Sequence, residues 1–412
     1  MSRIIAALKA AVRHPAYAHA VIATDNVVAR VAGVRRRGSG SGARYSVCIV
    51  APPGDGNIGD QALLESALDN TSESVVVIVR NPAAFSIPDR FKERTSVLVL
   101  KDLLYGNPVA RLRDVWAFSR TAESSLNTWV IGADTMDGAY NPRASVARLS
   151  CAAIAARLGS QARVVGFSWN GHAVESATAA LRRVQDSVQL TVRDPVSVER
   201  LQRIGVEEPT AAADLVFARI GGVPEHADVF DWVSQEERTG RRIMVVNVSA
   251  LLQSEFSQAD EYAEFLRKFD SGSWSFVFIP HVRRRGNDDY VALSEVLAKY
   301  KPASCFVLSD LLSPDQVFAL ARRSTLVVTG RMHLAVLSIL AGTYPVTLAS
   351  QGKVEGLYRL LSEERMCLSP GEGVGLKLLE VSQAVILQGL AERGVAESDL
   401  DRLREAALRN FE

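Results

Sequence analysis

The sequence predicts an α/β protein of two domains, each built on a parallel sheet with helices on both faces. Short runs rich in Val and Ile alternate with stretches of helical spacing, which is typical of parallel sheets. One long polar stretch, near residues 218–240, interrupts this alternation. The 412 residues are also too many for one ordinary core, but they suit two domains.

These patterns divide the chain into five segments. We expect a basic N-terminal extension and linker over residues 1–44, a Rossmann-like domain over 45–217, a linker over 218–240, a second Rossmann-like domain over 241–380 and a C-terminal helical segment over 381–412. The strands expected in the first domain are YSVCIVA, SVVVIVR, TSVLVL, NTWVIGA, ARVVGFS and VQLTVRD. Those expected in the second are IMVVNVS, WSFVFIPHV, SCFVLSD, TLVVTGR and YPVTLA.

The first 44 residues are strongly basic. They hold eight Lys and Arg but a single acid, Asp25, so this segment carries +7 and the remainder −6 within a whole chain of +1. Two interpretations stay open. One is a basic amphipathic helix that makes peripheral contact with an anionic membrane through residues 1–40. The other is a solvated extension ending in the linker RRRGSGSGAR. The residues near helical spacing and the cations beside them are Ile4, Ile5, Leu8, Ala11, Val12, Arg3, Lys9 and Arg13.

The overall composition limits the partners and the location of the protein. A net charge of +1 gives no field for binding nucleic acid. No apolar run reaches the roughly 20 residues of a membrane span. The four cysteines are scattered and form neither a CxxC nor a Cys/His pattern, so we expect reduced thiols in a cytoplasmic protein and no zinc site. If the basic segment binds lipid, the protein would lie at the inner face of the membrane.

A glycine-rich loop, APPGDGNIGDQAL, joins the first expected strand to the first helix of the domain. Glycine lets the backbone approach a ligand closely, and the N-terminus of a helix favours an anion. The loop is neither a GxGxxG fingerprint nor a P-loop, because it has no GK[ST]. On spacing alone, it is either a tight structural turn or a ligand-binding loop.

Polar residues also follow the other expected strands, where open parallel sheets bind their ligands. Each residue has a structural interpretation beside the functional one: Arg193 and Asp194 as a capping pair, His281 as an ordinary loop histidine, and Asp137 as an Asx-turn residue. The residues at these strand ends are Asp134, Asp137, Ser168, Asn170, His172, Arg193, Asp194, His281, Arg331 and His333.

Five motifs in order resemble the polysaccharide pyruvyl transferase family. They are GNIGDQAL, GADTMDG, VRDPVSVERLQRIGV with the later AADLVF, IPH followed by NDD, and GRMHLAVLSILAGTYPVTL with KVEGLYRLL. The resemblance runs from about residue 48 to 362 and implies a GT-B-like architecture, in which two Rossmann-like domains face a cleft. It also implies transfer of the enolpyruvyl unit of phosphoenolpyruvate onto two sugar hydroxyls, which gives a cyclic ketal and phosphate.

The resemblance implies roles for the polar residues. Arg331 and Arg193 would bind the anionic donor once the domains close, and His333 would be the general acid. Asp60, Asp55 or Asp137 would deprotonate the sugar hydroxyl. Asn57, Gly59, Asp134, Asn170 and His281 complete the expected substrate contacts. Phosphoenolpyruvate would be the donor substrate, the acceptor would be a sugar that is polymeric or lipid-linked, and no further cofactor and no metal would be needed.

The sequence departs from the family pattern at one place. Many members have a run of glycines where this chain has Gly132, Ala133 and Asp134. Asp134 would be a sugar-hydroxyl ligand or a helix cap. Two rival functions remain: a glycosyltransferase that uses a nucleotide sugar, for which Glu355 would be the nucleotide-binding carboxylate, and a non-catalytic sugar-binding protein.

Overall fold

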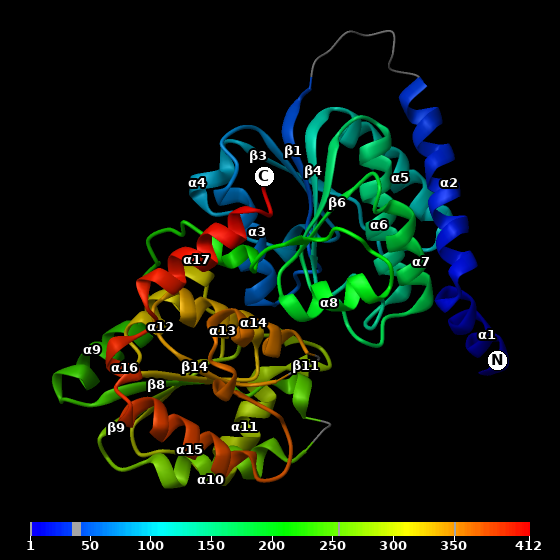
Figure 1. The fold of residues 1–412 in the computed structure, drawn as a ribbon. Coiled ribbons are helices and arrows are strands. Elements are labelled where there is room, and N and C mark those ends of the chain that lie inside the picture. The colour runs from blue at the N-terminus through cyan, green and yellow to red at the C-terminus, as the bar shows by residue number, and fades with distance from the viewer. Residues whose placement is uncertain (1, 35–42, 254–255, 350–351) are drawn as a thin grey trace. The chain divides into compact units, whose positions relative to one another are not determined.

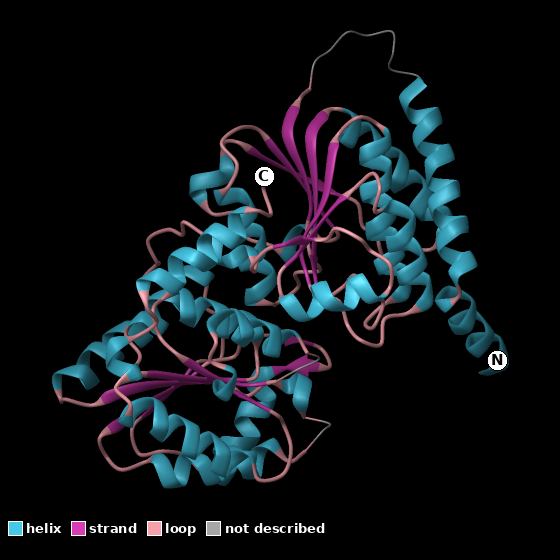
Figure 2. Cartoon of the chain, in the orientation of Figure 1, coloured by secondary structure: helices cyan, strands magenta, loops and turns pink. Residues whose placement is uncertain are grey.

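The computed structural model describes residues 2–34, 43–253, 256–349 and 352–412. The described residues form two compact units. The first unit draws on residues 1–55, 63–215 and 406–412, and the second on residues 56–62 and 216–405. Each unit has one central sheet with helices on its faces (Figures 1 and 2). The α/β fold class is therefore confirmed.

The first unit holds a seven-stranded parallel sheet of order β3-β2-β1-β4-β5-β6-β7. Its strands are β1 (Tyr45–Val50), β2 (Val75–Val79), β3 (Thr95–Val99), β4 (Ser125–Ala133), β5 (Gln161–Phe167), β6 (Gln189–Val192) and β7 (Thr210–Ala211). The order reverses between β1 and β4, which pair directly. In open α/β sheets such a reversal marks the usual ligand-binding crevice.

The helices of the first unit begin where the sequence supplies caps. Asn107, Asn141 and Asp194 each accept a backbone N–H of the following helix, and each is followed by a proline that suits the first helical position. The helices are α1 (Ser2–Arg13), α2 (Pro15–Val34), α3 (Ile58–Asp69), α4 (Asp89–Lys92), α5 (Pro108–Glu123), α6 (Pro142–Arg157), α7 (Glu175–Val184) and α8 (Pro195–Arg203). Short 3₁₀ turns cover Pro82–Ala84 and Leu215–Ala218.

The second unit holds a six-stranded parallel sheet of order β12-β9-β8-β13-β14-β15 and the antiparallel hairpin β10-β11. Its strands are β8 (Arg242–Val246), β9 (Trp274–Phe278), β10 (Arg283–Arg284), β11 (Asn287–Asp288), β12 (Cys305–Val307), β13 (Leu326–Thr329), β14 (Pro345–Leu348) and β15 (Cys367–Leu368). Its helices are α9 (Asp228–Arg238), α10 (Gln258–Phe269), α11 (Asp289–Lys299), α12 (Pro314–Arg322), α13 (Met332–Leu340), α14 (Lys353–Leu361), α15 (Val374–Leu387), α16 (Leu390–Arg393) and α17 (Glu397–Leu408), with 3₁₀ turns at Ala250–Leu252 and Glu364–Met366.

The N-terminal segment differs from the expected extension, because residues 15–34 are a packed helix of the first unit. Figure 1 shows α2 lying along the helices of that unit. Ala18, Ile22 and Ala29 of α2 are buried in its core cluster. Asp25, also fully buried, makes a two-pronged ion pair with Arg111 of α5 at 2.5 and 2.7 Å. The cluster Arg35–Arg37 and most of the expected linker lie outside the described residues.

Two other domain boundaries differ from those that the sequence predicted. Helix α9 lies within the linker expected at residues 218–240, so about half of that stretch is helical. The last residues of the chain return to the first unit, where the side chain of Asn410 accepts the backbone N–H of Gly166 at 2.9 Å and Phe411 packs on Trp129. Of the helices in the described part of the chain, none combines the length and the apolar character needed to cross a membrane.

Candidate active site

The R-x-H motif lies at the start of α13. Arg331 occupies the N-cap position between β13 and α13, and its backbone N–H donates to the hydroxyl of Thr329 at 2.9 Å. His333 follows in the first turn of the helix and is half-buried. Arg331 and His333 therefore both stand at a helix N-terminus, where backbone N–H groups already favour an anion.

A buried carboxylate holds the Arg331 guanidinium. Asp289, the first residue of α11, is fully buried, and its oxygens accept Nε of Arg331 at 3.1 and 3.2 Å and Nη2 at 2.5 Å. Nη2 also donates to Asn287 at 2.5 Å. Burial alone would raise the pKa of Asp289, but Arg331 and the hydrogen bonds outweigh it and hold the pKa below its usual range. The pair is thus a fixed ion pair.

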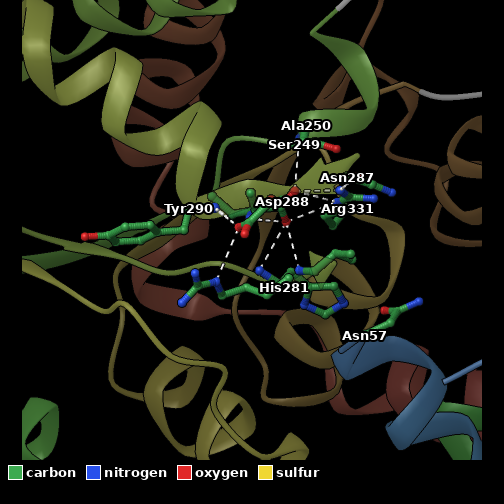
Figure 3. A network of polar contacts seen from close by, with 12 residues as sticks. Asn57, Ser249, Ala250, His281, Asn287, Asp288, Tyr290 and Arg331 are labelled. Atoms are coloured by element: carbon green, nitrogen blue, oxygen red, sulfur yellow. Dashed lines mark hydrogen bonds and ion pairs between the residues drawn. The ribbon is translucent and has the colours of Figure 1, made fainter. Parts of the chain in front are cut away.

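Other donors surround the same carboxylate. Asp289 accepts the backbone N–H groups of Ala250, His281 and Val282 and the side-chain amide of Asn247, at 2.9 to 3.1 Å. Figure 3 shows these bonds converging on one carboxylate. The hydrogen bonds of Arg331 to described residues use its backbone N–H, Nε and Nη2, and none uses Nη1. The network therefore orients the guanidinium and leaves one nitrogen for a ligand.

His281 is buried beside this network. The residue is 2% exposed, and neither ring nitrogen has a hydrogen-bond partner among the described residues. In Figure 3 the ring lies between the Arg331 network and Asn57. Burial lowers the pKa of His281 to about 3, although Asp289 opposes the shift. The ring is therefore neutral at physiological pH, and it can both donate to and accept from a ligand.

We expect this shift to make folding depend on pH. The pKa of His281 is lowered on folding, so between about pH 6.5 and the folded value the unfolded chain binds more protons. The free energy of unfolding should then fall by about 1 kcal/mol per pH unit as the pH drops from 6 to 4. Urea unfolding at pH 6, 5 and 4 checks this, with His281→Gln as the matched variant. If the free energy of unfolding fell equally steeply with pH in the wild type and in His281→Gln, the prediction would be contradicted.

Residues 57–59 of the glycine-rich loop belong to the second unit and contact the same residues of that unit. Asn57 caps α3, since its side chain accepts the N–H of Gly59 at 3.0 Å. The N–H of Ile58 donates to the carbonyl of His281 at 3.1 Å. A Cβ on Gly59 would collide with the His333 imidazole, 2.7 Å from Cγ and closer still to Nδ1. Gly59 is therefore glycine because His333 lies against it, which spacing alone does not reveal.

The first unit contains a separate cluster around Arg193. This arginine is fully buried, and its guanidinium contacts Asp134, Asp214 at 2.9 Å and the hydroxyl of Ser168 at 2.8 Å. Burial lowers the pKa of Arg193, but Asp134 and Asp214 raise it more, so the group stays charged. Asp194 caps α8 through the N–H of Ser197, as the structural interpretation predicted.

The remaining predicted residues lie as follows. Asp137 is buried, and its carboxylate accepts the backbone N–H of Ala139, which matches the expected Asx-turn. The same carboxylate accepts the backbone N–H of Asn170, so these two predicted substrate-binding residues are in contact. Asp60 is buried in the first turn of α3. Asp55 has a left-handed backbone, with φ of 49°. Ala133 has φ of 47°, a conformation that favours glycine and explains a glycine run at this place.

Sequence reasoning missed the carboxylates that hold the two arginines. Asp289 belongs to the NDD motif and Asp214 to AADLVF, so both motifs were noticed, but neither residue was assigned a role. Their signal is an acid at a strand or helix end within a buried stretch, which only the fold can pair with a particular arginine.

Comparison with known families identifies the group to which these motifs belong. The family model of polysaccharide pyruvyl transferases matches residues 57–352. The chain belongs to this family. The matched range includes the Arg331 and Arg193 clusters and the capped start of α3. No curated protein sequence gives a significant match to the chain.

Solved structures are similar to the chain in fold. UDP-GlcNAc 2-epimerase from Methanocaldococcus jannaschii has a TM-score of 0.56 at 10% identity, covering 89% of this chain and 98% of its own. The epimerase from Neisseria meningitidis bound to UDP-GlcNAc has a TM-score of 0.55 at 10% identity, covering 89% and 98%. HepE from Anabaena, in complex with UDP and glucose, has a TM-score of 0.55 at 11% identity, covering 89% and 97%. These similarities confirm the GT-B-like fold class of two Rossmann-like domains.

Proposed function

We propose that this pyruvyl transferase family member transfers the pyruvyl group of phosphoenolpyruvate to two hydroxyls of a sugar in a polysaccharide or glycolipid. The product would be a cyclic pyruvate ketal, with phosphate released. The observation that carries the proposal is the arrangement at the start of α13, where a buried carboxylate orients Arg331 two residues before His333. An anionic donor fits an oriented guanidinium at a helix N-terminus.

The donor carries a phosphate and a carboxylate, and both prefer arginine. We assign the first contact to Nη1 of Arg331, because Asp289 and Asn287 occupy the other nitrogens of its guanidinium. Arg193 remains a second candidate, but its guanidinium is buried among Asp134, Asp214 and Ser168. A donor would have to replace one of these contacts, with Asp134 the more exposed of the two carboxylates.

The reaction would begin with a proton from His333 to the methylene carbon of phosphoenolpyruvate, which leaves an oxocarbenium-like centre at C2. One sugar hydroxyl adds to this carbon and loses its proton to a carboxylate, for which Asp60, Asp55 and Asp137 are candidates. The C2–O bond to phosphate then breaks, and phosphate leaves with the bonding electron pair and the proton held by the carboxylate. The second hydroxyl adds to C2 and closes the ketal, and its proton returns to His333. The neutral His281 beside the network would hydrogen-bond to substrate or to the imidazole of His333.

Arg331→Lys tests the donor assignment. We expect phosphoenolpyruvate affinity to fall roughly tenfold to a hundredfold although the charge is kept, because an ammonium cannot reproduce the planar fork. Isothermal titration measures the affinity, with Arg193→Lys in parallel and the exposed Arg322→Lys as the control. Donor affinity equal to that of the wild type in both the Arg331 and Arg193 variants would remove these residues from the donor site.

A second candidate function is sugar transfer from a nucleotide sugar. One observation favours it: an oxygen of the Glu355 carboxylate in α14 is buried without a hydrogen-bond partner among the described residues. Similar folds bind UDP in solved structures. Thermal melting with phosphoenolpyruvate and with UDP-sugars separates the candidates, because a ligand raises the melting temperature of the protein that binds it. Stabilisation by UDP-sugars alone would favour the second function.

We also propose that the protein is cytoplasmic and meets a lipid-linked acceptor at the inner face of the membrane. The outward face of α2 supports this contact, since Val27 and Val31 are 59% and 52% exposed. Lys9, Arg13 and Arg30 are exposed on α1 and α2. The only acid among the first 44 residues, Asp25, is buried. An exposed apolar stripe with cations and no outward acid suits an anionic surface.

Charge reversal on α1 and α2 tests the membrane contact, because deleting residues 1–40 would remove the packed helix α2. We expect the triple variant Lys9→Glu, Arg13→Glu, Arg30→Glu to lose sedimentation with anionic vesicles at low salt, since each cation contributes about 1 kcal/mol. The control reverses the same number of charges on exposed Lys268, Arg402 and Arg404. Equal sedimentation of both variants would reject a specific contact through α1 and α2.

A further inference from the structure

Two arginines at the tip of a short hairpin of the second unit have no acidic partner. The hairpin β10-β11 has the sequence RRRGND, and its turn falls at Arg285 and Gly286. Arg284 and Arg285 are exposed. Among the described residues, neither guanidinium makes an ion pair or a hydrogen bond, whereas the first arginine of the hairpin, Arg283, pairs with Asp288 at 3.3 Å. Adjacent like charges repel each other, so an anion bound at the tip would stabilise them.

The pairing of the hairpin decides which way Arg284 points. Arg284 pairs with Asn287 across the hairpin, and Arg283 pairs with Asp288. The side chains of directly paired residues lie on the same face, with Cβ atoms about 5 Å apart, and successive pairs alternate between the two faces. Arg284 therefore shares one face with Asn287, while Arg283 and Asp288 share the other.

The face that carries Arg284 is also the face of the Arg331 network. The side-chain oxygen of Asn287 accepts Nη2 of Arg331 at 2.5 Å. On the opposite face, the guanidinium of Arg283 lies over the ring of Tyr290, 5.0 Å from its centre. Figure 3 shows the same division, with Asn287 and Arg331 on one side of the network and Tyr290 on the other. An anion held by Arg284 would therefore lie next to the ligand of Arg331.

The glycine-rich loop holds this hairpin in place. The backbone N–H of Arg283 donates to the carbonyl of Gly56 at 2.8 Å, and Asn57 forms a β-bridge with Val282. A Cβ on Gly56 would collide with the carbonyl oxygen of Arg283, and the φ of Gly56 is 74°, so glycine is required there. The backbone N–H of Asp289 closes the base of the hairpin by donating to Val282 at 2.9 Å. A fixed element therefore carries the two arginines, as precise binding requires.

The exposure of the two arginines fits the acceptor better than the donor. The groups that surround the proposed donor position are buried, with Arg331 9% and His281 2% exposed. Such groups can enclose a small molecule. A glycan is larger, so it must extend beyond them to the surface, where Arg284 and Arg285 lie.

We propose that Arg284 and Arg285 form an anion subsite for the acceptor, which binds a phosphate or carboxylate carried by the acceptor sugar. Arginine suits both groups, because its planar fork binds two oxygens at once. The inference rests on the proposed function, since it takes the Arg331 network as the donor site. It adds that the acceptor is anionic, and it assigns two residues to its recognition.

Three forms of one sugar test the subsite on the full chain: galactose, galactose 1-phosphate and galacturonic acid. Isothermal titration should show that the wild type binds at least one of the two anions more tightly than galactose. We expect the double variant Arg284→Gln, Arg285→Gln to bind that anion about three- to tenfold more weakly, because two exposed charge-assisted contacts are lost. Its affinity for galactose should not change. The anion that is affected distinguishes a sugar phosphate from an acidic sugar as the source of the charge.

The control double variant is Arg238→Gln, Arg322→Gln, which removes two exposed arginines at the ends of α9 and α12. It should bind all three sugars as the wild type does. Equal affinity of the wild type and the Arg284, Arg285 variant for both anions would overturn the proposal.

Titration with phosphoenolpyruvate separates this proposal from the proposed reaction. The donor should bind equally well to the wild type and to both double variants. Weaker donor binding only in the Arg284, Arg285 variant would assign these arginines to the donor and overturn the acceptor subsite. The comparison of the three sugars needs no phosphoenolpyruvate. A wild type that does not bind the donor would therefore reject the proposed reaction, while the sugar titrations would still decide for or against the subsite.

Discussion

His333→Gln is expected to lower turnover by about 10² to 10⁴ while phosphoenolpyruvate still binds, the usual effect of removing a general acid. The position of the imidazole supports this expectation, because it lies in the first turn of α13, two residues from Arg331 and against Gly59. Turnover follows from phosphate release, and donor affinity from titration calorimetry. Glutamine keeps hydrogen-bonding capacity, so a loss of rate with retained binding would point to proton transfer.

Gly59→Ala provides an independent route to the same imidazole. The added Cβ would lie 2.7 Å from Cγ of His333, so the ring would have to move. We expect a loss of turnover approaching that of His333→Gln, with His333 itself unchanged. Gly33→Ala is the matched control, because its added Cβ would meet its neighbours only at the ordinary distance of 3.5 Å. If both His333→Gln and Gly59→Ala kept turnover within a few-fold of the wild type, the proton would have to come from another group.

The sequence predicted the strands well because their signal is local. Each expected Val- and Ile-rich run is a strand of the structure, and α8 begins at Asp194, the capping residue that the sequence predicted. The motif resemblance also located the right family. These features depend on neighbouring residues along the chain, so periodicity and cap chemistry are sufficient to find them.

The packing of α2 and the partners of the arginines depend on residues distant in the chain. Basic composition suggested an extension over residues 1–44, yet Asp25 pairs with Arg111, 86 residues away. Arg331 likewise finds Asp289 across 42 residues, and Arg193 finds Asp214 across 21. Sequence identified these arginines by their motifs, but it could not show that carboxylates already hold them.

Asp289→Ala should be among the most destabilising single substitutions in the second unit. The substitution would leave the Arg331 guanidinium without its buried counter-charge. It would also leave the backbone N–H groups of Ala250, His281 and Val282 without their acceptor. Removing one member of a buried ion pair costs about 3 to 5 kcal/mol of the free energy of unfolding. Urea unfolding measures it, with exposed Asp310→Ala as the control.

The double variant Asp289→Leu, Arg331→Met separates stability from donor binding. Replacing both charges with apolar groups should recover part of the lost unfolding free energy, because no unpaired charge remains. Recovery should be incomplete, since the backbone N–H groups around position 289 still lack an acceptor. If Arg331 binds the donor, phosphoenolpyruvate affinity stays lost in the double variant even where stability returns. If Asp289→Ala had the same free energy of unfolding as the wild type, the structural role of Asp289 would be contradicted. If the double variant bound phosphoenolpyruvate as tightly as the wild type, the role of Arg331 in donor binding would be contradicted.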